Sequence, residues 1–115
     1  MIENCGVFLG TLMQSRNQAH IYHLQSRSYA QHVALNTYYD DIVELIDSLA
    51  ESIQGRYGII KGYKSSAFMK EDEYPVITYF EALCKYVESA RENLPQDSYI
   101  PVSYTHLRAH ETLRY

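Results

Sequence analysis

The stretch SYAQHVALNTYYDDIVELIDSLAESIQ, residues 28–54, decides the fold of this chain. It runs for 27 residues without glycine or proline, far longer than an ordinary strand. Its apolar residues recur every three or four positions, as on one face of an amphipathic helix. These residues are Tyr39, Ile42, Val43, Ile46, Leu49, Ala50 and Ile53. Ser28 suits the N-cap and Gly55 offers a C-terminal stop, so the pattern predicts one long helix.

Another helix is predicted before this stretch, from Ile2 to Leu24. The segment has no proline, and its apolar residues follow the same spacing, although Gly6 and Gly10 weaken the pattern in the first turns. The residues on its apolar face are Cys5, Phe8, Leu9, Leu12 and Met13. A polar turn, residues 25–28, follows. Helices joined by so short a turn are expected to lie side by side and antiparallel.

A third helix is predicted after a connection of residues 55–72, which contains three glycines and has room for one helical turn. Asp72, Glu73 and Pro75 favour a helix start. Helical spacing then continues to about Asn93, before Pro95. The apolar positions are Val76, Ile77, Phe80, Leu83, Tyr86, Val87 and Ala90. Together the segments predict an all-α fold.

The composition sets outer limits on function. A chain of 115 residues is enough for one compact domain. No apolar run approaches the roughly 18 residues of a membrane span, and the start has no basic leader, so we expect a cytoplasmic protein without a membrane partner. Cys5 and Cys84 fit neither a disulfide framework nor a thiolate metal site. The net charge of −4 does not favour nucleic acid as a partner, although it leaves that partner open.

Four residues have the chemistry of metal ligands: His20, His32, Asp47 and Glu51. Imidazole nitrogen and carboxylate oxygen together suit a divalent ion such as Fe²⁺. Asp47 and Glu51 are four positions apart, so on a helix their carboxylates project from one face. The turn after the first helix can bring His20 towards His32. These pairs are two candidate half-sites.

One chain cannot close both half-sites around one metal ion. His32 precedes Asp47 by fifteen residues on the same helix, which is a rise of about 22 Å. Fifteen steps return the side chain to within roughly 60° of the same face. Two such helices packed antiparallel about a two-fold axis would bring His32 of one chain opposite Asp47 and Glu51 of the other. The spacing therefore predicts a homo-oligomer with a site at its two-fold interface.

The arrangement His, eleven residues, His, fourteen residues, Asp, three residues, Glu resembles the inter-subunit ferroxidase motif of the Dps family, the ferritin-like DNA-binding proteins from starved cells. The resemblance covers roughly residues 3–56 well and the third helix in outline. It differs at Ile21, where the family usually has Trp, and at Asn36, where it often has an acidic residue. These differences leave open whether the site holds one iron or two. Short relatives of this kind resemble bacteriophage-borne proteins.

The resemblance implies a ferritin-like four-helix bundle, with residues 1–100 as an incomplete domain lacking its fourth helix. It also implies a ferroxidase, with His20, His32, Asp47 and Glu51 as both catalytic residues and metal ligands at a di-iron or mono-iron site. Fe²⁺ would be oxidised by peroxide or oxygen, and ferric iron would be stored in a dodecameric shell, protecting the cell from peroxide. The alternative is a non-catalytic helical interaction protein that keeps the fold without iron chemistry.

The last residues differ in character from the rest. From Pro101 onward, PVSYTHLRAHETLRY has no coherent apolar face, and residues 102–112, VSYTHLRAHET, resemble the translation of a transposon-type sequencing adapter. We therefore expect residues 101–115 to be a non-native tail and the natural gene to continue into a fourth helix. A natural frayed tail is the alternative. In an adapter-derived tail the i, i+4 spacing of His106 and His110 is an accident.

Several residues have ordinary roles beside the functional ones. Helical carboxylates usually form a solvated face. His23 could be a local ligand beside His20, but a surface histidine is the simpler interpretation. Tyrosines near an oxidising iron centre could accept electrons, although packing is their usual role. Those tyrosines are Tyr22, Tyr29, Tyr38 and Tyr39. Lysines in the connection, Lys61, Lys64 and Lys70, have acidic residues close behind them and are expected to form a solvated loop.

Overall fold

The structure is a computed structural model that describes residues 2–70 and 73–93. In this part of the chain every regular element is a helix: α1 (Ile2–Gln25), α2 (Tyr29–Tyr57), α3 (Val76–Ala90) and one 3-10 turn, η1 (Arg91–Asn93). The predicted all-α fold class is confirmed. The predicted tail from residue 101 lies outside the described residues. Among the described helices none is long and apolar enough to cross a membrane.

Helix α2 begins as predicted and ends later than predicted. Ser28 is the N-cap, and its side-chain oxygen accepts a hydrogen bond from the Gln31 amide at 3.3 Å. The prediction that Gly55 stops the helix was wrong. The chain leaves the helix at Gly58, whose φ of 95° favours a residue without Cβ, and the Gly58 amide closes the last turn on the Gln54 carbonyl at 2.9 Å.

Helix α3 follows the predicted start and is shorter than predicted. Pro75 occupies the N-cap position and Val76 begins the helix. The α-helix ends at Ala90, and the last three residues before the end of the described segment tighten into η1. The connection that precedes α3 contains no helix in its described residues, 58–70 and 73–75.

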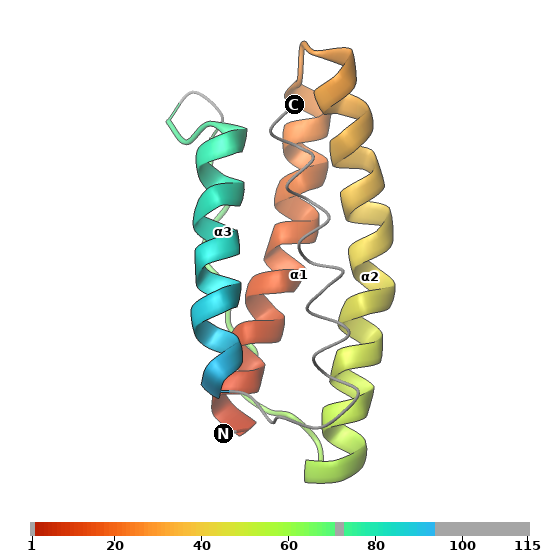
Figure 1. The fold of residues 1–115 in the computed structure, drawn as a ribbon, viewed down its shortest axis with the longest axis vertical. Coiled ribbons are helices and arrows are strands. Elements are labelled where there is room, and N and C mark those ends of the chain that lie inside the picture. Colours follow the sequence, from red (N-terminus) through yellow and green to blue (C-terminus); the bar gives the residue numbers. More distant parts are fainter. Residues whose placement is uncertain (1, 71–72, 94–115) are drawn as a thin grey trace.

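The three helices run in the order up, down, down. Figure 1 shows α1 and α2 antiparallel beside each other, and α3 on the opposite side of α1 in that view. Because α3 runs in the same direction as α2, the connection after Tyr57 has to return along the length of the molecule before α3 can begin. It is therefore a crossover connection between two helices that run in the same direction.

The crossover lies against α1 along most of its length. A Cβ atom added at Gly6 would come within 2.8 Å of the Gly62 and Lys61 carbonyl oxygens, and one added at Gly10 would come closer still to the Lys64 carbonyl oxygen. The two glycines that weakened the helical pattern therefore have a packing reason. They let the backbone of the crossover lie directly on the helix.

Further along α1, side-chain hydrogen bonds replace the glycine contacts. The fully buried amide of Gln18 pairs with both backbone groups of Met69, donating to its carbonyl at 3.1 Å and accepting from its amide at 2.7 Å. The Tyr22 hydroxyl donates to the Tyr74 carbonyl at 2.6 Å. Buried polar groups need such partners. Helix α1 thus contacts the crossover at several points between Lys61 and Tyr74.

The core lies mainly between α1 and α2, and α3 joins it through aromatic rings. Phe80 of α3 meets Tyr38 of α2 edge to face at 5.1 Å. The residues on the predicted faces are mostly buried or half-buried, and three are exposed. Met13, Val43 and Ile77 are 40%, 37% and 42% exposed. Each lies next to a buried residue in the sequence, and one step of about 100° turns it away from the core.

Candidate functional site

The turn between α1 and α2 gathers three histidines. Helix α1 ends at Gln25 and α2 begins at Tyr29, so the last turns of one helix lie beside the first turns of the other. His20 and His23 come from α1 and His32 from α2, and all three side chains are half-buried. The predicted approach of the first helix to the second is therefore present at this end of the molecule.

His23 and His32 form a reciprocal pair. Their rings stack with centroids 3.6 Å apart and planes at 23°. The Nδ1 of His32 lies 2.9 Å from the His23 carbonyl oxygen, and the Nδ1 of His23 lies 2.7 Å from the His32 carbonyl oxygen. The expectation that His23 is a surface histidine was wrong, because it packs across the turn against His32.

These hydrogen bonds settle which nitrogen carries the proton. A carbonyl oxygen only accepts, so both Nδ1 atoms are N–H donors. In a neutral imidazole the other nitrogen, Nε2, then keeps its lone pair. A histidine that ligates a metal through one nitrogen usually donates its other N–H to such an oxygen. His32 thus has the protonation pattern of an Nε2 ligand.

His20 lies one turn before His23 and belongs to a neighbouring polar group. Its ring centroid is 6.1 Å from that of His23 and 4.4 Å from that of Tyr39, on which it stacks at 19°. The Tyr39 hydroxyl donates to Oδ1 of Asn36 at 2.6 Å, and the Asn36 amide donates to Asp40 at 3.1 Å. Tyr39 therefore packs next to a predicted ligand, and a hydrogen-bond network holds its ring in place.

Asp47 and Glu51 are both exposed and stand one turn apart on α2. They are not brought to the histidines within the chain. Among the described residues no group of three or more His, Cys, Asp or Glu side chains is close enough to hold a metal ion. The sequence placed the complete site between two chains, so a single chain contains the two halves separately.

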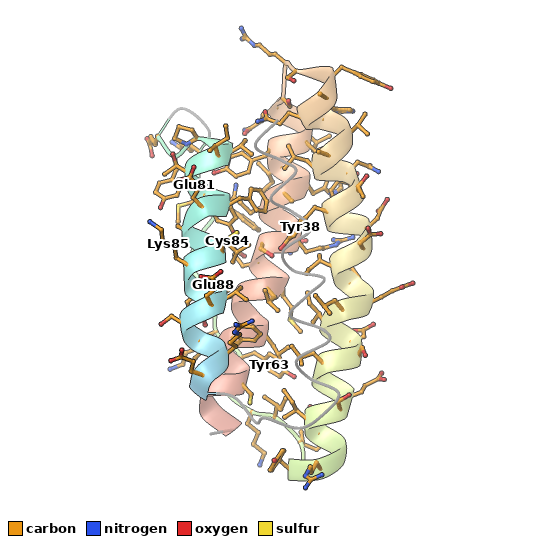
Figure 2. The ribbon with its side chains drawn as sticks, viewed as in Figure 1. Tyr38, Tyr63, Glu81, Cys84, Lys85 and Glu88 are labelled. Carbon is orange, nitrogen blue, oxygen red and sulfur yellow. The ribbon has the colours of Figure 1, made fainter. Side chains whose placement is uncertain are left out.

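The tyrosines divide between core and surface. Tyr22 and Tyr38 are buried and Tyr29 is 82% exposed. Burial raises the pKa of Tyr38 far above its usual range, and a hydrogen bond with Ser15 opposes this shift. Figure 2 shows Tyr38 and Cys84 directed into the space between the helices and Lys85 directed outward. Burial also raises the pKa of Tyr79. Repulsion from the charges of nearby tyrosines raises it further.

The sequence also made predictions for the lysines of the crossover and for the two cysteines. Lys61, Lys64 and Lys70 are exposed along the crossover. Cys5 is buried, which raises the pKa of its thiol, and Cys84 is half-buried; neither forms a disulfide. Neither cysteine is exposed as a reactive thiol usually is.

The sequence predicted His23 only as a local ligand or a surface histidine, and its pairing with His32 was not predicted. His23 carries no motif, and only its spacing shows its role. It lies three residues after His20 and nine before His32, with the turn between, so a fold-back of the two helices places it opposite His32.

Fold and site together define a small all-helical protein with a histidine cluster at the turn of its first two helices and an acidic pair further along the second. The chain belongs to a family of unknown function, DUF5856, whose model matches residues 23–105. The matched range includes His23, His32, Asp47 and Glu51 and begins after His20. No curated protein and no solved structure matches it.

Proposed function

We propose that this protein binds ferrous iron at a site shared between two copies of the chain and oxidises it there. The observation that carries the proposal is the division of ligands along one helix. Helix α2 is unbroken from Tyr29 to Tyr57 and carries His32 near one end and Asp47 and Glu51 near the other. Their separation of about 22 Å requires a second chain to complete either half.

The surface of α2 supports a two-fold contact along that helix. At about 100° per residue, His32, Val43 and Asp47 fall within roughly 60° of one another around the helix. Val43 lies between the two half-sites and is 37% exposed, and Val33 beside His32 is 43% exposed. An antiparallel α2 from a second chain would cover this side and bring each histidine pair opposite a carboxylate pair.

The order and directions of the described helices support a ferritin-like bundle as the proposed fold. Ferritin-like folds differ from simple up-down bundles by one long crossover between helices. In this chain the crossover lies between α2 and α3, which consequently run in the same direction. By resemblance to the Dps family, the proposed assembly is a dodecameric shell that stores ferric iron.

Iron is the substrate in this proposal, and the chain supplies ligands and access. The carboxylates of Asp47 and Glu51 offset the positive charge of the ion, and a carboxylate-rich ligand set favours the ferric product. Each ferrous ion gives up one electron to peroxide or oxygen. Asp47 and Glu51 are exposed in the single chain, so both carboxylates are accessible to an iron ion and to the histidine pair of a second copy.

The test uses the fact that each proposed site takes its histidines from one chain and its carboxylates from another. One variant carries His20→Ala and His32→Ala, and the other carries Asp47→Ala and Glu51→Ala. Each alone should oxidise Fe²⁺ slowly, followed by ferric absorbance, whereas refolded mixtures should regain activity because each heterodimer has one complete site. Heterodimers that demonstrably form and stay inactive would contradict the proposal and favour a non-catalytic interaction protein.

A further inference from the structure

We propose that His23 is a positioning residue that holds His32 with its Nε2 free to bind a divalent metal ion. This inference rests on the proposed function, which assigns His32 as a ligand but gives His23 no role. The evidence is the reciprocal pair at the turn: stacked rings with centroids 3.6 Å apart and two Nδ1 atoms, each bonded to the other residue's carbonyl oxygen.

The pair uses groups that the helix ends leave available. The His23 carbonyl lies in the last turn of α1, where carbonyl oxygens have no partner within the helix. It accepts the Ser26 amide at 3.4 Å and, at the shorter distance of 2.9 Å, the Nδ1–H of His32. The His32 carbonyl lies in the first turn of α2 and receives the Nδ1–H of His23 at 2.7 Å. A carbonyl oxygen has two lone pairs, so this bond adds to the helical one.

The consequence for His32 is a single ring orientation. A half-buried imidazole without such restraints can rotate and can carry its proton on either nitrogen. The backbone oxygen of His23 selects the Nδ1–H tautomer, and the stacked ring of His23 prevents rotation about the last side-chain bond. The Nε2 lone pair is then fixed in direction before any metal arrives, which lowers the entropic cost of binding.

A purely structural role is the competing explanation, since the pair also ties α1 to α2. The two roles differ in what His23→Ala should change. If the pair only stabilised the turn, any equal loosening of the turn would weaken metal binding to the same extent. Ser28→Ala provides that control, because it removes the N-cap bond to the Gln31 amide but touches neither histidine ring.

The experiment has two readouts on the full-length protein. The first is the tautomer of each histidine in the metal-free protein, read from long-range ¹H–¹⁵N correlations at mildly alkaline pH. The second is affinity for Co²⁺, a probe that needs no oxidant, followed by its visible absorption. The variants are His23→Ala, His23→Phe, which keeps a stacked ring, and Ser28→Ala.

We expect His32 to be the Nδ1–H tautomer in wild type and in Ser28→Ala. In His23→Ala the carbonyl oxygen of residue 23 remains but the stacked ring is lost, so the His32 ring should rotate more freely and its tautomer should be less uniform. Co²⁺ affinity should then fall about 10- to 100-fold, as is typical when a partner of a metal ligand is lost. His23→Phe should recover most of that affinity, and it provides the test if His23→Ala does not fold. Ser28→Ala should bind like wild type.

The failures of the two proposals are distinguishable. If wild type binds Co²⁺ but His23→Ala binds equally well, or Ser28→Ala loses as much, the positioning role is overturned and the shared site stands. The same holds if wild-type His32 carries its proton on Nε2. If wild type does not bind Co²⁺ although it forms dimers, the proposed metal site is wrong, and the positioning role with it.

Discussion

The carbonyl oxygen of Lys64 lies directly over the Cα of Gly10, so close that no side chain fits between them. This contact joins α1 to a crossover segment 54 residues later in the sequence. Since the nearest neighbours of Gly10 are backbone atoms, they cannot turn aside as a flexible side chain could. The crossover backbone therefore packs directly on α1 at this point.

Replacement of Gly10 by Ala should therefore destabilise the protein, by about 1–3 kcal/mol, because the new methyl group overpacks the contact. Gly55→Ala is the matched control: it is also helical, but nothing lies within 4 Å of its added Cβ. There the substitution should stabilise by roughly 0.5–1 kcal/mol. Urea unfolding measures both. Equal effects at the two glycines would contradict the close approach.

Gln18→Leu should cost about 1–3 kcal/mol of unfolding free energy, because it leaves the amide and carbonyl of Met69 without their partner. The exposed Gln25, at the end of the same helix, is the control, and Gln25→Leu should change stability little. Amide hydrogen exchange gives a local readout. The Met69 amide should exchange faster in Gln18→Leu. Unchanged protection of this amide would argue against its hydrogen bond with Gln18.

Alkaline pH should destabilise the protein. Burial raises the pKa of Tyr38 and Tyr79, so in the folded state both stay neutral where the unfolded chain ionises. Their contribution is therefore complete below about pH 10, the usual tyrosine pKa, and is lost as pH rises further. Urea midpoints across this range should fall more gently for Tyr79→Phe than for wild type. Replacement of the exposed Tyr29 by Phe should leave the dependence of the urea midpoint on pH unchanged.

Asp47→Ala combined with Glu51→Ala should abolish rapid Fe²⁺ oxidation and leave helicity by circular dichroism nearly unchanged. Both side chains are exposed, so their loss removes ligands and no core packing. The exposed pair Asp41 and Glu44, also on α2, serves as the control for lost negative charge. An oxidation rate that survives the first pair, or falls equally with the second, would count against the ferroxidase proposal.

The sequence by itself determined the helices, because their signals are local. The glycine-free run after Ser28, its apolar spacing and the N-cap predicted α2 nearly to its end, and the proline at residue 75 marked the start of α3. The boundary at Gly55 was missed because a glycine can also occupy helical backbone. Only the observed φ of 95° shows that Gly58 ends the helix.

The tertiary structure alone decided which residues meet. Two contacts join residues more than 50 positions apart: Gly10 with Lys64, and Gln18 with Met69. No periodicity in the sequence encodes such a pairing. The candidate site also has one part that the sequence determined and one that only the tertiary structure decided. Ligand types and spacing on α2 can be read along the chain, since helical rise is fixed. The stacking of His23 on His32 depends on the packing of α1 against α2, because a ring's neighbours are set by the fold and not by its position in the sequence.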